Sequence, residues 1–531
     1  MEDHSARPRV RNLLLAGAHL LLTLGVLALP AHLRPLWPAL VALVMVFATR
    51  SAALSLGTAC LAALILLGVH HGEVLQQWFA PEGGLLNTLN SPWHRGALIF
   101  TLLLGSFAAV VERSGGLLPL LRAEGEVNDR TRKRFLTSVF GLGLVCFFDG
   151  LANALMIGRV ARPVADRLRI PRAFLAYLVD TTSSAVACLA FLSTWIVTQL
   201  SYIASYSPID QPAYLQFLAS IPNNFYCLFA LLLAFLAIRR QWLIGPMRTR
   251  QPVALEEEDA PLPAGHGQLR RALVPLLILL LSIPLAIFVL YAPAEPPENF
   301  SLRIQGALNA STVPTAFVVG SALALLTAIA YFPRDRFAEA PRAALLGARQ
   351  LVPALLILLL AWILGSLFRE LGTAKVLSDT LGDRLPLSWF PAGVFLLGCV
   401  ISFVSGTSWG TMGILMPLVL PTAGAMALSQ GASPELLASL VPAVIGAVFG
   451  GAVFGDHCSP YSDTTIVSAL ASGVSTAEHT ITQLPYALLA AATALMAGYL
   501  PIAFGLPAWF ALLSGSGVLV ALVLVPMRRH T

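Results

Sequence analysis

Charged side chains are scarce in this chain. Aspartate, glutamate, lysine and arginine together make up 11% of its 531 residues, whereas hydrophobic residues make up 57%. Soluble globular domains carry about 25% charged residues, so the composition excludes that class. Apolar runs long enough to span about 30 Å of hydrocarbon recur from end to end. We therefore expect an all-α protein that crosses a membrane many times.

Cysteine is also sparse, and one common energy-coupling motif is missing. No glycine-rich loop with a lysine is present, which argues against an ATP-driven pump. The net charge of +6 comes with arginines in the short segments between apolar runs, so it does not imply a nucleic-acid partner. Membrane lipid is the expected surrounding, and no resident cofactor is expected. A disulfide framework is not expected either, because the cysteines lack paired spacing and lie in or beside apolar stretches: Cys60, Cys146, Cys188, Cys227, Cys399 and Cys458.

The arginines also predict the sidedness of the connectors. Arginine-rich segments are expected in the cytoplasm, and segments with at most one arginine are expected outside. This rule gives about 12 crossings of the inner membrane with both termini cytoplasmic. It places four segments in the cytoplasm, namely Met1–Asn12, Arg113–Arg134, Arg239–Arg271 and Phe332–Gln350, and three outside, namely His70–Gly96, Ser201–Asn224 and Ala292–Thr312.

The segment Phe135–Gly158 breaks this alternation because arginines flank it on both sides. A full crossing would place the arginines that follow it on the outside. A re-entrant hairpin that enters from the cytoplasm and turns at residues 148–153 avoids this. Non-helical backbone at membrane depth is tolerated only where protein or a water-filled cavity satisfies it. We therefore expect the tip of this hairpin to line a cavity.

A second hairpin is expected over Phe390–Ala423, turning at residues 405–410 and entering from the outside. Each hairpin precedes a long apolar element that polar residues interrupt, at 180–184 within Ala173–Leu200 and at 455–465 within Leu436–Ser472. The sequence thus predicts two inverted repeats, each with a re-entrant hairpin and a broken helix, meeting at a midplane site. The expected division is 1–96 N-terminal membrane helices, 97–238 first inverted repeat, 239–271 cytoplasmic linker, 272–350 connecting membrane helices, 351–504 second inverted repeat and 505–531 C-terminal helix.

Residues 455–465 form a dense polar cluster, Gly-Asp-His-Cys-Ser-Pro-Tyr-Ser-Asp-Thr-Thr, within an apolar stretch. A carboxylate at the centre of a membrane helix costs about 2.5–3.5 kcal/mol, so such residues mark functional sites. Pro460 interrupts the helix and frees backbone carbonyls, and hard cations such as sodium favour oxygen ligands. The alternative is that each aspartate caps a broken helix end. The cluster predicts an ion or substrate site made by Asp456, His457, Ser459, Asp463 and Thr464.

Further candidate ligands lie at the two hairpin tips and in the first broken element. Asp180 could instead act as a structural cap or pair with a cytoplasmic arginine. A hypothesised sodium ion would take its oxygens from Asp456, Asp463, Ser459 and Thr407. The other candidate ion or substrate ligands are Asp149 and Asn153 at the first tip, Asp180 and Thr181 in the broken element, and Thr407 and Ser408 at the second tip.

Two motifs allow enzymatic interpretations that the context does not favour. The run Gly406–Gly410 fits the Gly-x-Ser-x-Gly pattern of a nucleophile elbow, but the apolar run before it is typical of a helix rather than of the required strand. His457 and Cys458 are adjacent and would point apart on a helix, which argues against zinc. No enzymatic activity is therefore expected. The remaining Trp, Tyr and His residues near span ends are expected to be interfacial anchors.

Three stretches resemble the NhaC-type sodium/proton antiporter family, within the ion-transporter superfamily. They are Ser405–Met412, Gly455–Thr465 and Phe147–Asn153, the last followed by Arg162-Pro163 and Asp180. The resemblance covers roughly residues 95–500. It implies secondary transport in an inverted-repeat fold and an elevator-like movement of the hairpin unit. Gly150 stands where the family often has a second aspartate, and Tyr461 where isoleucine is common, which affects the expected ion stoichiometry.

The function expected from these features is sodium/proton exchange. Burial favours the neutral form of a carboxylate and a bound cation favours the ionised form, so sodium and protons are expected to compete for the aspartates. The alternative is sodium- or proton-coupled transport or exchange of a small organic solute: an amino acid, a carboxylate or a quaternary amine. No arginine or lysine lies in either polar cluster, but helix N-termini can bind carboxylates, and Trp195 or Trp409 could stack on an ammonium group. Whether the chain forms a homodimer is left open.

Overall fold

The computed structural model describes residues 6–524 with short gaps. The gaps are 28–29, 31–32, 71, 81–82, 117–118, 120–126, 253–267, 292–302, 304–305, 309–311 and 382–384. Every regular element in the described part of the chain is helical. The acidic run at 256–259 of the expected linker lies outside the described residues.

The expected all-α polytopic fold is confirmed. Within the described ranges, ten helical stretches are long and apolar enough to cross a membrane. Three shorter apolar helices lie at Val10–Val26, Arg34–Thr49 and Ala508–Leu524. The count of 12 crossings and the repeat symmetry stay predictions.

The chain divides into two compact units that interleave along the sequence. Unit 1 comprises residues 1–95, 199–223 and 353–455, and unit 2 comprises residues 96–198, 224–352 and 456–531. Four helices contribute residues to both units, namely α6 (Pro92–Ser114), α10 (Ile196–Tyr206), α16 (Glu339–Leu371) and α20 (Pro434–Cys458).

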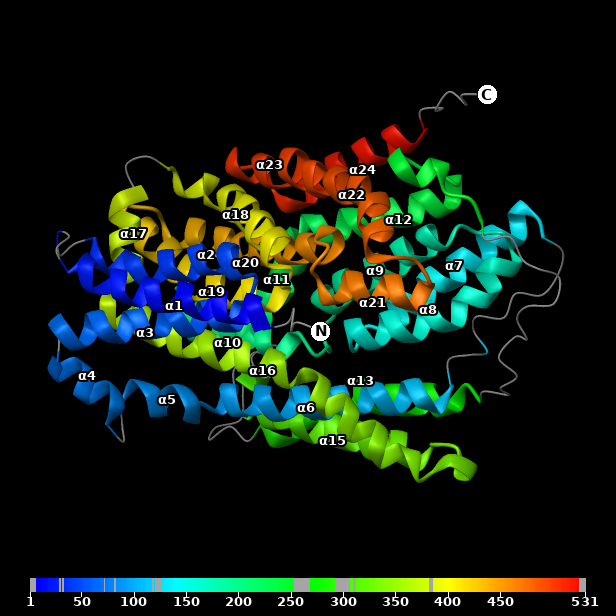
Figure 1. The fold of residues 1–531 in the computed structure, drawn as a ribbon, viewed down its shortest axis with the longest axis horizontal. Helices are drawn as coiled ribbons and strands as arrows, with labels where there is room; N and C mark the ends of the chain where they lie inside the picture. Colours follow the sequence, from blue (N-terminus) through cyan, green and yellow to red (C-terminus); the bar gives the residue numbers. More distant parts are fainter. Residues whose placement is uncertain are drawn as a thin grey trace. The chain divides into compact units, whose positions relative to one another are not determined.

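Unit 1 packs N-terminal helices against helices from the second half of the chain. Contacts join α2 to α18 and join α3 to α19, so helices coloured blue and yellow lie side by side (Figure 1). Its remaining helices are α1 (Ala6–Val26), α2 (Trp37–Thr49), α3 (Ala52–His70), α4 (Gly72–Phe79), α5 (Gly84–Asn90), α11 (Ala213–Ser220), α17 (Thr373–Leu381), α18 (Phe390–Ser405) and α19 (Ser408–Ser429).

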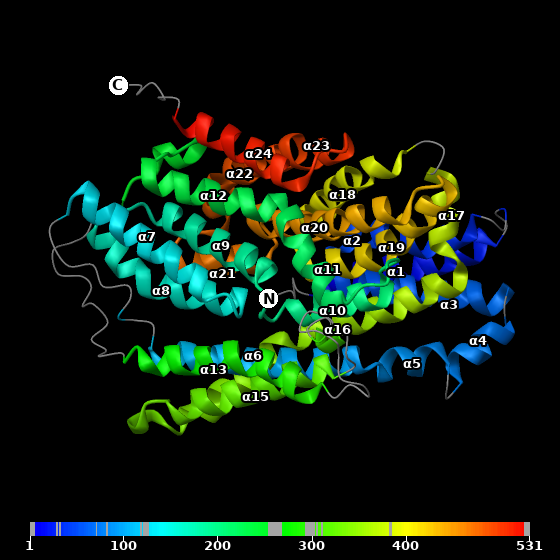
Figure 2. The same ribbon diagram turned by 180° about the vertical axis from the view of Figure 1, so that it is seen from behind.

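Unit 2 brings the first hairpin together with a helix that lies about 300 positions later in the sequence. Helix α21 contacts both α8 and α9, and both views show it beside them (Figure 2). Its remaining helices are α7 (Asp129–Val145), α8 (Gly150–Arg167), α9 (Arg172–Leu189), α12 (Phe225–Arg240), α13 (Arg270–Leu290), α15 (Val313–Ala330), α21 (Asp463–Ser472), α22 (Thr476–Thr493), α23 (Leu500–Ala503) and α24 (Ala508–Leu524).

Both expected hairpins are pairs of helices joined by a short turn. In the first, α7 ends at Val145 and Asp149 caps α8, accepting a hydrogen bond from the Ala152 backbone N–H at 2.8 Å. In the second, Gly406 takes the left-handed conformation (φ +65°), and Thr407 caps α19 by accepting from Gly410 N–H at 3.1 Å. The turns are shorter than expected, because residues 150–153 and 408–410 already belong to the helices that follow.

The position expected for the first helix break was wrong. Residues 180–184 continue α9 without interruption, and the break comes after Leu189. Hydroxyl groups in this stretch bond to carbonyls of the same helix, from Thr182 to Leu178 at 2.8 Å and from Ser183 to Asp180 at 2.8 Å, so the polar residues need no break. The second break is confirmed within the expected stretch, at residues 459–462 between α20 and α21.

Glycines allow α18 and α20 to approach closely. The Ser402 hydroxyl donates to the Gly451 carbonyl at 2.6 Å, and a Cβ added at Gly455 would lie 2.3 Å from the Ser402 carbonyl carbon. We expect Gly455→Ala to lower stability by about 1–3 kcal/mol, because backbone must shift to admit the methyl group. Thermal unfolding of the purified protein measures this. Gly393→Ala in α18 is the control, because a Cβ there meets nothing within 4 Å. Equal melting temperatures for the two variants would contradict the close packing.

Candidate functional site

The break between α20 and α21 is held together by hydroxyl groups. Pro460 has no N–H to donate, so the last carbonyls of α20 need other partners. The Asp456 carbonyl accepts from Thr464 Oγ1 at 3.2 Å and from Thr465 Oγ1 at 2.5 Å. The backbone of Asp456 therefore serves the fold, which leaves its carboxylate for another role.

The Asp456 carboxylate is fully buried in an oxygen-rich surrounding. Ser462 Oγ donates to Asp456 Oδ1 at 3.3 Å and lies 2.9 Å from Thr464 Oγ1. Ser459 is also fully buried at the same break. Carboxylate and hydroxyl oxygens are ligands that suit a hard cation. The described residues contain no group of three or more His, Cys, Asp or Glu side chains placed to hold a metal ion. Any cation here would therefore depend on hydroxyl and carbonyl oxygens as well.

Asp180 is engaged by side chains from two other helices. Its Oδ1 accepts from Ser468 in α21 at 3.1 Å, and its Oδ2 accepts from Gln483 Nε2 in α22 at 2.8 Å. Nε2 of His479 lies 3.3 Å from the same Oδ2, and both side chains are fully buried. The suggested pairing of Asp180 with a cytoplasmic arginine is therefore wrong, because a histidine occupies that role.

Asp149 and Asp463 both lie at the start of a helix, but at different positions: Asp149 is the N-cap of α8, whereas Asp463 is the first residue of α21, whose N-cap is Ser462. Asp149 caps α8, and Asp463 Oδ1 accepts from the Thr464 backbone N–H at 2.9 Å in the first turn of α21. The capping alternative raised for the 455–465 aspartates is therefore wrong for Asp463, because Ser462 occupies the N-cap position of α21. Helix α8, which Asp149 caps, helix α9, which holds Asp180, and helix α21, which begins with the exposed residue Asp463, all contact one another. Three acidic groups from three elements therefore share one region of unit 2.

The first hairpin tip is fastened to α9 and to the break that follows it. The Asn153 amide donates to the carbonyls of Gly143 at 2.9 Å and Thr182 at 3.1 Å, which ties α8 to α7 and α9. The Thr194 N–H in the break donates to the Phe148 carbonyl at 2.9 Å. Asn153 thus positions the tip, and its Oδ1 has no hydrogen-bond partner among the described residues.

His457 and Thr181 meet at a small cavity with room for about one water-sized molecule. Nδ1 of His457 lies 2.8 Å from the Tyr226 hydroxyl oxygen, and Gln483 also lines the cavity. Among the described residues, His457 Nε2 and Gln483 Oε1 have no hydrogen-bond partner. The cavity therefore joins the region of Asp456 to the helix that holds Asp180.

Thr407 and Ser408 belong to unit 1. Ser408 is buried at the start of α19, and the Thr407 carbonyl accepts from Thr411 Oγ1 at 2.8 Å. The Gly-x-Ser-x-Gly run begins in the turn after α18 and continues into the first residues of α19. The strand that a nucleophile elbow needs is replaced here by α18.

Three residues that surround Asp180, namely His479, Gln483 and Ser468, were not predicted from the sequence. His479 is fully buried, so its expected role as an interfacial anchor was wrong. One signal was available: His479 and Gln483 stand four positions apart, which places both on one face of α22. Ser468 carried no signal beyond being a hydroxyl residue in an apolar helix.

Comparisons with known proteins agree with this arrangement. A model of the Na+/H+ antiporter family matches residues 186–502. An uncharacterized protein of Haemophilus influenzae is 30% identical over 482 residues, covering 88% of this chain and 90% of its own. A malate-2H+/Na+-lactate antiporter of Bacillus subtilis is 37% identical over 98 residues, 18% of this chain and 19% of its own. The crystal structure of the YdaH transporter from Alcanivorax borkumensis shares the fold, with a TM-score of 0.56 at 16% identity over 86% of this chain and 99% of its own.

Proposed function

Because this chain belongs to the Na+/H+ antiporter family and is a multi-pass membrane protein, we propose that it exchanges sodium for protons across the cytoplasmic membrane. Both termini would lie in the cytoplasm, as the arginine distribution predicts. The protein would act as a transporter without a resident cofactor and without enzymatic chemistry.

The proposal is supported most directly by the mutual contacts of α8, α9 and α21, which bring Asp149, Asp180 and Asp463 into one region of unit 2. Among the described residues, no arginine or lysine forms an ion pair with any of these three side chains. Asp149 and Asp180 are buried, and like charges placed near one another repel; binding a proton or a cation relieves this repulsion. Since either one relieves it, binding one disfavours binding the other. This competition is the physical basis of exchange.

Each group has a distinct part in the proposed exchange. Asp456 and Asp463 would hold sodium together with hydroxyl groups at the α20–α21 break, including Ser459 and Thr464. Asp180 would respond to the ion through its contacts with His479 and Gln483.

Alternating access would use the two helix pairs as re-entrant hairpins of two inverted repeats. In each hairpin a short turn leads into a helix whose N-terminus is capped by a polar side chain. Asp149 caps α8 in the first hairpin, and Thr407 caps α19 in the second. Half-helix ends of this kind present backbone groups to an ion at membrane depth. An elevator-like movement of a hairpin unit is part of the proposal.

A flux measurement tests this function. Proteoliposomes containing the purified chain and a pH-sensitive dye should show proton movement when sodium is added outside, whereas empty liposomes should not.

A thermal-shift screen with sodium, lithium, amino acids, dicarboxylates and quaternary amines should show stabilisation by sodium. The short match to a malate-2H+/Na+-lactate antiporter makes dicarboxylates the informative comparison. Saturable stabilisation by an organic solute, with none from sodium alone, would replace simple exchange by solute transport.

A further inference from the structure

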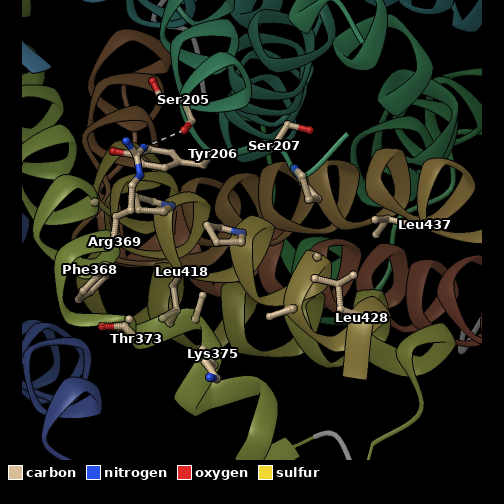
Figure 3. Close-up of a pocket in the computed structure, with 18 residues that line it drawn as sticks. Ser205, Tyr206, Ser207, Phe368, Arg369, Thr373, Lys375, Leu418, Leu428 and Leu437 are labelled. Atoms are coloured by element: carbon tan, nitrogen blue, oxygen red, sulfur yellow. Dashed lines mark hydrogen bonds between the residues drawn. The ribbon is translucent and has the colours of Figure 1, made fainter. Parts of the chain in front are cut away.

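Unit 1 contains a second cavity, of about 700 Å³, that the proposed exchange does not use. It lies among α16, α17, α19 and the end of α10, and its lining residues are drawn in Figure 3. Ligand-binding cavities in proteins typically measure about 300–1,000 Å³. The cavity is therefore large enough for a small organic molecule or for part of a lipid.

The charged side chains that line this cavity are all positive. Arg369 and Lys375 both line it, and no acidic residue is among its described lining residues. The Arg369 guanidinium donates to the Ser205 carbonyl at 3.1 Å, which holds it at the edge of the cavity (Figure 3). Neither cation forms an ion pair in the described part of the chain. A ligand that balances this charge would be an oxyanion.

The backbone places both cations at helix ends. Arg369 lies in the last turn of α16, and Lys375 lies in the first turn of α17. Gly372 between them has φ +68°, a conformation that glycine adopts without strain, and it allows α16 to turn directly into α17. Arginine and lysine at the ends of membrane helices lie at the level of the lipid headgroups.

The rest of the cavity is mainly apolar. Leu418 and Leu437 line it, and Leu428 at its edge is 86% exposed. Leu428 is the next-to-last residue of α19, so its exposed side chain lies near a helix end, where it can contact the part of an acyl chain closest to the headgroup. The cavity thus offers cations for a headgroup and apolar surface for a chain.

We propose that this cavity binds an anionic phospholipid, with the phosphate held by Arg369 and Lys375 and an acyl chain along Leu418 and Leu428. Basic pockets between membrane helices are suited to anionic lipid headgroups. A soluble phosphate shares the headgroup chemistry but has no chain to cover the leucines. Lipid binding here requires no transport, so it can be measured on the purified full chain in detergent.

Native mass spectrometry with added phosphatidylglycerol or phosphatidylcholine tests this proposal. We expect the anionic lipid to remain bound in preference to the zwitterionic one. Arg369→Gln and Lys375→Gln should each weaken phosphatidylglycerol binding about fivefold, and together about 25-fold. Arg130→Gln is the matched control, because Arg130 is an exposed arginine in α7 of unit 2, and it should leave binding unchanged.

A further variant separates the contribution of the acyl chain to lipid binding from the contribution of the headgroup charge. Leu428→Ser should weaken binding of both lipids and keep the preference for the anionic one, and its high exposure makes misfolding from lost packing negligible. Three outcomes would overturn the proposal: equal binding of the two lipids, unchanged binding by the Arg369→Gln/Lys375→Gln variant, or displacement of the lipid by millimolar inorganic phosphate or succinate. The last outcome would make the cavity a site for soluble anions.

Discussion

Asp456→Asn is expected to abolish sodium-driven proton movement while the protein stays folded. The Asp456 carbonyl, which accepts from Thr464 and Thr465, is unchanged by the substitution. An asparagine oxygen can still accept from Ser462 at the position of Oδ1. What disappears is the negative charge at the centre of the proposed cation site, and with it the competition between sodium and protons.

The experiment compares proton flux in proteoliposomes containing the original chain, Asp456→Asn or Asp379→Asn. Asp379 is an exposed acidic residue in α17, so its substitution should leave flux unchanged. Thermal unfolding checks that Asp456→Asn retains its melting temperature. Normal sodium-dependent flux in Asp456→Asn would remove this residue from the site.

Asp180→Asn is expected to lower both transport and stability. The fully buried Asp180 carboxylate accepts from Ser468 and Gln483 and pairs with His479. Asparagine replaces one acceptor oxygen with an NH₂ group, which would face the donors of its neighbours. Removing one member of a buried, hydrogen-bonded pair typically costs about 3–5 kcal/mol. This loss would be the largest of any single substitution considered for unit 2.

Chemical or thermal unfolding measures the loss, and flux in proteoliposomes measures its functional consequence. Asp129→Asn is the control, because the Asp129 side chain is 71% exposed and pairs with Arg132 at the surface. Such a surface pair contributes about 0–1 kcal/mol. His479→Gln should reproduce part of the loss, since it removes one partner and leaves the carboxylate. A melting temperature for Asp180→Asn equal to that of Asp129→Asn would show that the buried network does not stabilise the fold.

Residue patterns alone predicted the two hairpins and the second helix break. Flanking arginines identified the first hairpin. Gly406 identified the turn of the second hairpin, and the φ angle of this glycine is positive. Pro460 identified the second break because proline has no N–H to continue a helix. These are local effects, so a sequence expresses them directly.

The position of the first break was not predicted correctly, because polar residues are ambiguous signals in a membrane helix. A hydroxyl group at 180–184 can mark a helix break, or it can bond to a carbonyl of its own helix. In α9, the hydroxyl groups of Thr182 and Ser183 bond to carbonyls of the same helix. The choice depends on what packs around the segment. In this chain the break falls instead where Thr194 reaches the first hairpin tip at Phe148.

By itself, the sequence determined the class of the protein and indicated the aspartates that we propose bind ions. Scarce charge and recurrent apolar runs require a membrane setting, and carboxylates are too costly there to be incidental. Only the tertiary structure decided which partners each carboxylate has. Asp180 meets His479 and Gln483 about 300 positions later because α9 and α22 pack against each other. Such contacts depend on which helices pack against each other. The spacing of residues along one helix does not indicate its neighbours.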